Sequence, residues 1–164
     1  LEALRQLNGL EMTLVLAADD PESSRWVDLV AENCNGVTCE LIPMWNCREN
    51  YLREIIKSDF VVDQFYLGAM GGISMDCFML NKAALVHLDP VATRYCYGED
   101  FPLPPLADSQ AIKDQILRLQ HVEYRLSLSE KLHQFQRKHH IPQRVVCRFL
   151  KELNNRGVHI ESSL

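Results

Sequence analysis

Short apolar runs and amphipathic segments alternate along residues 1–89. Four apolar runs predict strands buried in a sheet: residues 12–20, 37–44, 59–65 and 83–89. The segments between them carry apolar side chains at helical spacing, as Trp26, Leu29 and Val30 do, and predict helices over residues 21–36, 48–58 and 71–82. A first helix is expected to end at Asn8-Gly9.

The pattern changes after residue 89. Residues 98–106 are rich in proline and are expected to be extended. Helical spacing then returns over residues 108–120, 126–140 and 142–155, with Asp108 or Ser109 as a good N-cap. Strands that alternate with helices predict a parallel sheet. The chain is therefore predicted to be a single α/β domain over residues 1–164: a Rossmann-like, doubly wound parallel sheet with helices on both faces and a helical C-terminal tail.

Polar residues stand at the carboxyl ends of the predicted strands. In doubly wound sheets ligands bind beyond these ends, where the next helices begin. One rim of the sheet is therefore expected to carry Asp19-Asp20, Trp45-Asn46, the loop at residues 68–72, and Asp89.

The loop after the third predicted strand is the strongest candidate for chemistry. A glycine-rich junction between a strand and a helix brings backbone N–H groups and the positive end of the helix dipole close to a ligand, which suits a phosphate or a sugar diphosphate. A tight turn with close contact between helix and strand explains the same glycines equally well, and the spacing is neither a Walker A motif nor GxGxxG. The candidate phosphate-binding residues are Gly68, Ala69, Met70, Gly71 and Gly72.

Asp76 falls in the helix that follows this loop. A carboxylate near a helix N-terminus is stabilised by the dipole, so stability alone explains its position. Acids in nucleotide-binding α/β domains also accept hydrogen bonds from ribose hydroxyls. Asp76 is therefore a candidate ribose ligand.

Composition narrows the class of partner. The net charge is −5 with acids and bases mixed along the chain, which argues against a general nucleic-acid surface. No apolar run reaches the roughly 18–20 residues of a membrane span, and no secretory leader opens the sequence. The chain begins at Leu1 rather than methionine, which predicts a domain cut from a longer protein.

Six cysteines are present without a CxxC pair. Cys34 and Cys39 flank a turn-like Asn-Gly with no histidine pair nearby, so no metal site is predicted. We interpret the cysteines as small apolar residues with free thiols in a reducing cytoplasm.

Residues 58–86 resemble the signature of family 4 retaining glycosyltransferases, which have the two-domain GT-B fold. In that family a strand "aDivvdq" leads to "G-x-x-G-x-x-x-x-E-A-M-A-x-G-K-P-V". Here residues 58–64 match the strand, Gly68 and Gly71 match the glycines, and residues 76–86 match the segment that begins at the acid. Bacterial surface-polysaccharide transferases look most similar, and the order of elements through the terminal helices resembles the family's donor-binding C-terminal domain.

The resemblance implies transfer of a hexose, with retention, from a nucleoside-diphosphate sugar to a glycan or lipid-linked acceptor held by a separate N-terminal domain. It places the Gly68–Gly72 loop at the donor sugar and phosphates and Asp76 at the ribose. Met44 and Trp45 would lie beside the nucleobase, whereas from the sequence alone packing as an aromatic at the rim is the favoured explanation of Trp45. No catalytic side chain, metal or cofactor is implied for this domain. The full-length protein would be cytoplasmic, or peripheral at the inner membrane face.

The sequence departs from the family at several positions. The family often has two glutamates eight residues apart, and these positions are Gly68 and the shorter Asp76. The Gly-Lys-Pro turn is replaced by Asn81-Lys82-Ala83, and the basic residues that grip the diphosphate would lie before Leu1. These departures motivate a second hypothesis, a degenerate domain without catalysis that acts through protein contacts.

A receiver-like or other small doubly wound domain is the third hypothesis. Asp19-Asp20 would supply its acidic pair, but the third predicted strand ends without an aspartate at its tip, which argues against it. Among the remaining polar residues, His87 is expected to be a buried structural histidine, and His139-His140 to cap the end of a tail helix.

Overall fold

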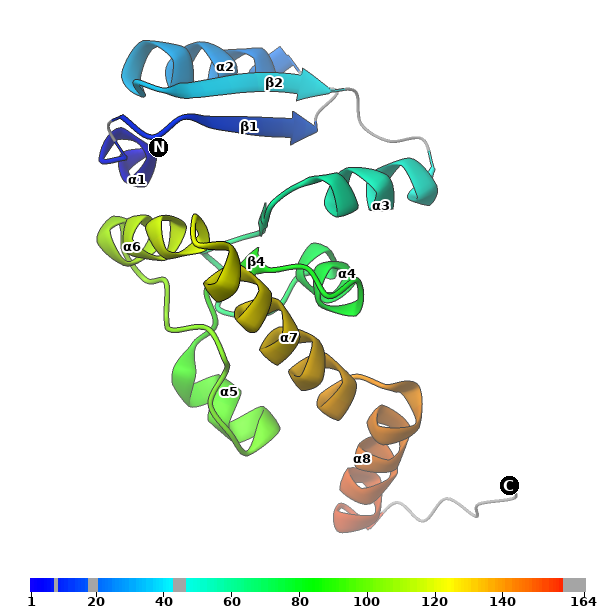
Figure 1. Ribbon diagram of the computed structural model, residues 1–164. Helices are drawn as coiled ribbons and strands as arrows, with labels where there is room; N and C mark the ends of the chain where they lie inside the picture. The colour runs from blue at the N-terminus through cyan, green and yellow to red at the C-terminus, as the bar shows by residue number, and fades with distance from the viewer. Residues whose placement is uncertain (8, 18–20, 43–46, 158–164) are drawn as a thin grey trace.

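The computed structural model describes residues 1–7, 9–17, 21–42 and 47–157. Within these ranges strands and helices alternate and are followed by a helical C-terminal part, so the protein is of mixed α/β class (Figure 1). The elements are α1 (Glu2–Arg5), β1 (Met12–Ala17), α2 (Pro21–Asn33), β2 (Val37–Ile42), α3 (Arg48–Lys57), β3 (Val61–Val62), α4 (Gly72–Met79), β4 (Ala84–Leu85), α5 (Pro90–Tyr97), α6 (Ser109–Leu119), α7 (Val122–His139) and α8 (Pro142–Asn155).

The first two strands form a parallel pair. Their register runs from Met12 opposite Val37 to Ala17 opposite Ile42. Helix α2 connects them and covers one face, where Val30, Cys34 and Val37 form a small buried cluster. Parallel strands need such a crossover connection, so the predicted βα unit is confirmed here.

Strands β3 and β4 form a second parallel pair. Val61 lies opposite Ala84 and Val62 opposite Leu85. Backbone hydrogen bonds extend the ladder beyond these residues, since the His87 N–H donates to the Gln64 carbonyl at 3.1 Å. Segment 83–86 is fully buried at the centre of the main core.

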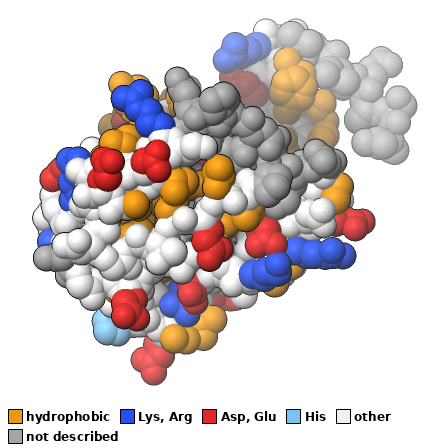
Figure 2. All heavy atoms as spheres, turned by 90° about the horizontal axis from the view of Figure 1, so that it is seen from above, with side chains coloured by type: hydrophobic (Ala, Val, Ile, Leu, Met, Phe, Trp, Pro, Cys, Tyr) orange, Lys and Arg blue, Asp and Glu red, His pale blue; other side chains and the backbone are white. Residues whose placement is uncertain are grey.

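The described strands do not join into the single doubly wound sheet that the sequence predicts. They form two separate pairs, β1–β2 and β3–β4. Alternate side chains of the first pair remain uncovered, with Val15 46% and Leu41 41% exposed, and Trp26 of α2 is also exposed. Seen from above, this end of the molecule carries apolar side chains between acids and bases (Figure 2).

Helix α5 occupies residues to which the sequence pattern assigned no element. Asp89 is its N-cap and accepts a hydrogen bond from the Ala92 N–H at 2.7 Å. Pro90 opens the first turn, and Gly98 ends the helix in the left-handed conformation, with φ +74°.

The predicted helical tail is confirmed. Asp108 caps α6 as expected, accepting from the Ala111 N–H at 2.8 Å. Helix α7 begins at Val122, before the predicted start at residue 126, and lies along α4 (Figure 1). The ring of His133 on α7 hydrogen-bonds to the Phe78 carbonyl at 2.8 Å, and Leu132 is fully buried in the main core. Across the described ranges, no helix combines the length and apolar character that crossing a bilayer requires.

Candidate functional site

The N-terminus of α4 is capped by a carboxylate from the preceding strand. Asp63 Oδ2 accepts from the Ser74 N–H at 3.1 Å and from the Ser74 hydroxyl at 2.6 Å. The N-cap residue itself is Gly71, which has no side chain for this purpose. A Cβ on Gly71 would lie 2.7 Å from Asp63 Oδ2, so this glycine is explained by the close approach of the carboxylate.

Asp63 also bears on the receiver-like hypothesis. Strand β3 ends at Val62, so Asp63 stands directly at its tip. The objection that the third strand ends without an aspartate was therefore wrong. The carboxylate is nevertheless engaged with the N–H and hydroxyl groups of Ser74 at the start of α4.

Gln64 braces the loop that follows. Its Oε1 accepts from the Leu67 N–H at 2.7 Å, and its Nε2 donates to the Ala69 carbonyl. At the other side of the loop, the Gly68 carbonyl accepts from the Asp89 N–H at 3.0 Å. The Asp63-Gln64 pair thus fixes both the glycine loop and the helix after it.

Gly68 and Gly72 provide a matched pair of substitutions. Gly68 has φ +64°, which alanine adopts only with strain, so Gly68→Ala is expected to lower the free energy of unfolding by about 1 kcal/mol. Gly72 is the first residue of α4, and a Cβ there meets open space. Gly72→Ala is expected to be neutral or to stabilise by up to about 1 kcal/mol. Urea denaturation followed by circular dichroism measures both, and equal effects would contradict this account of the loop.

Two backbone donors at the start of α4 remain open. Within the residues that the structure describes, the Gly72 and Ile73 N–H groups have no acceptor. Both residues are exposed. These N–H groups and the helix dipole are what an oxygen of a phosphate could contact.

Asp76 lies on the second turn of α4 and faces α3. Its Oδ1 pairs with Arg48 Nη2 at 2.5 Å, and it also takes part in a side-chain hydrogen bond with Tyr51. Its side chain is 15% exposed, whereas that of Arg48 is 68% exposed. Burial, and after it the negative charge of Asp76, raises the pKa of the Tyr51 hydroxyl, so Tyr51 remains a hydrogen-bond donor. Asp76 thus links α4 to α3 in this structure.

Lys82 supports the same pair of helices from the other end. Its Nζ donates to the Ile56 carbonyl at 2.9 Å and to the Ser58 carbonyl at 2.7 Å. These carbonyls belong to the C-terminal turn and C-cap of α3, where a cation is favoured by the helix dipole. The position that matches the family's lysine therefore has a structural role here.

The thiols do not form a nucleophilic or metal-binding group. All six cysteines are unpaired. Cys77 on α4 is fully buried, and burial, followed by the charges of Asp63 and Asp76, raises the pKa of its thiol to about 12. In the part of the chain that the structure describes, no three His, Cys, Asp or Glu side chains gather as a metal would require.

The structure describes only some of the other residues expected near the rim. Met44, Trp45 and Asp19-Asp20 are outside the described residues. His87 is partly buried, and its Nδ1 has no hydrogen-bond partner among the described residues. Asp89 caps α5 beside the loop.

Sequence reasoning missed the partners that hold the loop and α4: Arg48, Tyr51, Asp63, Gln64 and Ser74. The Asp63-Gln64 pair was available as part of the matched strand motif, but its position at the strand tip depends on where the strand ends. Ser74 was detectable as a small polar residue in the first turn of an apolar helix. The contacts of α3 with Asp76 carry no local sequence signal.

Comparison with known proteins returned no family model, no characterised protein and no solved structure that matches this chain.

Proposed function

We propose that this chain is the donor-nucleotide domain of a retaining GT-B glycosyltransferase, with a doubly wound sheet completed around the strands described above. It would bind a nucleoside-diphosphate sugar for transfer of a hexose to a glycan or lipid-linked acceptor, at the cytoplasmic side of the cell. No metal or cofactor is needed for this role.

The observation that carries the proposal is the open start of α4 within the family-like segment. Gly72 and Ile73 are exposed residues at a strand–glycine loop–helix junction, and their N–H groups, which have no acceptor among the described residues, suit a phosphate. Asp76 lies one turn further along the same helix. This order of groups supports a diphosphate at the loop and a ribose near the carboxylate.

Arg48 strengthens this arrangement. A cation in the first turn of a helix is disfavoured by the dipole, and here Asp76 offsets that cost. The guanidinium is 68% exposed and has donors to spare beyond its contact with one carboxylate oxygen. Arg48 therefore supports anion binding at this end of α4.

A second candidate function is a domain without catalysis that acts through protein contacts. The observation in its favour is that the Asp63 carboxylate occupies the start of α4, where negative charge opposes a phosphate. Asp76 is also already engaged by Arg48 and Tyr51. A nucleotide would have to compete for these groups.

Calorimetric titration with UDP and with GDP separates the two candidates. Donor binding predicts saturable binding of one nucleotide, weakened by Asp76→Ala by about 1–3 kcal/mol, as expected for a lost hydrogen bond to a charged group. Glu49→Ala is the matched control, because Glu49 is an exposed acid on the first turn of α3 and its loss changes the net charge equally. Thermal unfolding of each variant confirms that it is folded.

Two outcomes would count against the donor role. Absence of binding for both nucleotides, in this chain and in a longer protein that carries the basic residues expected before Leu1, would favour the domain that acts through protein contacts. Equal weakening by Asp76→Ala and Glu49→Ala would indicate a general charge effect and would remove Asp76 from the site.

A further inference from the structure

Helix α8 presents an apolar face that the rest of the described chain does not cover. None of its residues is buried. Val145 is 46%, Val146 50% and Phe149 61% exposed. Leu150 and Leu153 continue the same side of the helix and are partly exposed. The helix lies at one end of the molecule and meets the body mainly at its N-terminal turns (Figure 1).

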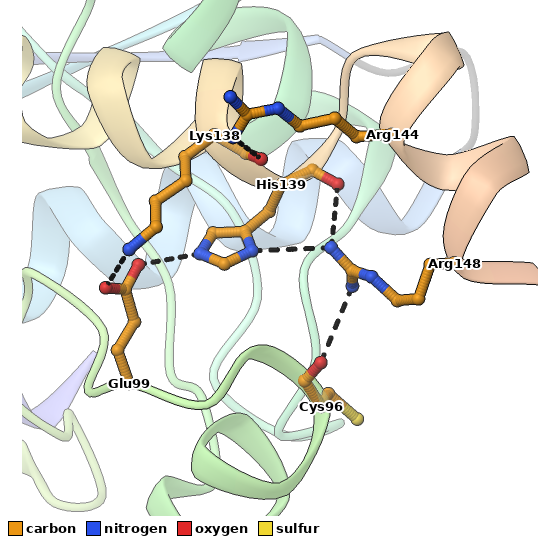
Figure 3. A network of polar contacts seen from close by, with 6 residues as sticks. All are labelled: Cys96, Glu99, Lys138, His139, Arg144 and Arg148. Atoms are coloured by element: carbon orange, nitrogen blue, oxygen red, sulfur yellow. Dashed lines mark hydrogen bonds and ion pairs between the residues drawn. The ribbon is translucent and has the colours of Figure 1, made fainter. Parts of the chain in front are cut away.

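The orientation of α8 is fixed by polar contacts on its opposite face. Arg148 Nη2 donates to the His139 carbonyl at 3.3 Å and lies 3.4 Å from His139 Nδ1 (Figure 3). The other ring nitrogen of His139, a residue only 5% exposed, contacts Glu99 Oε1 at 2.6 Å. Arg144 Nη1 donates to the Lys138 carbonyl at 2.9 Å. The arginines therefore tie the polar side of α8 to the end of α7 and leave its apolar side toward solvent.

Positive charge is concentrated at this end of the chain. Residues 137–157 contain one acid, Glu152, whereas the whole chain has net charge −5. The cations of this segment are Arg137, Lys138, Arg144, Arg148, Lys151 and Arg156. A helix with a basic polar face, an opposite face of Val, Phe and Leu, and low overall hydrophobicity is typical of helices that lie in a membrane interface.

A basic hollow adjoins the start of α8. It has a volume of about 470 Å³ and is lined by Arg137, Lys138, Ile141 and Arg144. Three of these four side chains are cations around a space large enough for a phosphate-bearing headgroup.

We propose that α8 and this hollow form a docking surface for an anionic phospholipid bilayer. At 14 residues the helix is too short to cross a bilayer and would lie in its plane. Val146, Phe149 and Leu153 enter the acyl boundary, and the surrounding cations meet lipid phosphates. A second copy of the chain fits less well, because pairing two α8 helices would bring two strongly basic segments together. A single projecting helix also offers a ridge, which a flat bilayer covers along its whole length.

Co-sedimentation of the 164-residue chain with lipid vesicles tests the proposal. Vesicles of phosphatidylcholine with about 30 mol% phosphatidylglycerol are compared with pure phosphatidylcholine. We expect binding to the anionic vesicles that falls with added salt, and little binding to the neutral ones. Phe149→Ser is expected to weaken binding about tenfold or more, since the ring leaves the acyl boundary. Lys151→Gln is expected to weaken it about fivefold.

Matched controls keep the test specific. Leu126→Ser changes an apolar side chain on α7 that is 64% exposed, close to the 61% of Phe149, and should leave binding unchanged. Arg53→Gln removes an exposed cation of α3 and should also have no effect. The proposal is overturned by absence of binding to anionic vesicles, which would leave an acidic protein as the partner of α8. It is equally overturned if Leu126→Ser weakens binding as much as Phe149→Ser.

Discussion

Replacing Leu132 by alanine is expected to lower the free energy of unfolding by about 2–5 kcal/mol. Leu132 has no exposed surface and lies in the main core together with Phe78 of α4 and Leu85 of β4. Truncation leaves a cavity where α7 crosses these elements. Urea denaturation followed by circular dichroism measures the change.

Leu126→Ala is the control for this prediction. It makes the same substitution on the same helix, at a side chain that is 64% exposed, and should change the free energy of unfolding by no more than about 0.5 kcal/mol. Similar changes in the free energy of unfolding for Leu132→Ala and Leu126→Ala would contradict the packing of α7 in the main core.

Replacing Asp63 by alanine is expected to lower the free energy of unfolding by about 2–3 kcal/mol. The substitution removes the acceptor for both the N–H and the hydroxyl of Ser74, a residue with no exposed surface. Asp63→Asn retains an acceptor oxygen and is expected to cost less, about 1 kcal/mol. In a Ser74→Ala background, Asp63→Ala should lower the free energy of unfolding by a smaller amount. The hydrogen bond between the Ser74 hydroxyl and Asp63 is already absent from that background.

Asp59→Ala is the matched control for Asp63→Ala. Asp59 is 75% exposed and pairs with Arg125 at 2.8 Å at the surface, so its loss should cost about 0–1 kcal/mol. Additive costs for Asp63→Ala and Ser74→Ala would contradict the contact between these two side chains.

Sequence patterns predicted the local elements better than their assembly. Apolar runs identified the four strands of the described ranges, and the spacing of apolar side chains identified the helical tail. The N-cap at Asp108 followed from a local rule, since a side chain caps the helix that it precedes. The same kind of local signal, Asp89 with Pro90 and Gly98, was present for α5 and was overlooked.

The arrangement of strands into sheets could not be predicted in the same way. Pairing between distant strands depends on which edges meet, and apolar runs contain no information on that. Side chains such as Val15 and Leu41 look as suitable for burial as Leu85, yet only Leu85 is fully buried.

The candidate site, too, could be predicted from the sequence only in part. The glycine loop and Asp76 were evident from the sequence, but the groups that occupy them come from elsewhere in the chain. Asp63 reaches Ser74 across eleven positions, and Arg48 reaches Asp76 across twenty-eight. Only the fold shows that Gln64 holds the loop by hydrogen bonds. Only the fold shows, too, that the Gly72 and Ile73 N–H groups lack acceptors among the described residues.

The most direct measurement is a nuclear magnetic resonance titration of the isotope-labelled chain with the nucleotide that calorimetry selects. The account predicts saturable shifts of the Gly72 and Ile73 amide signals, with the amides of α8 unchanged. Binding that shifts neither amide would place the nucleotide elsewhere and would contradict the proposed donor site.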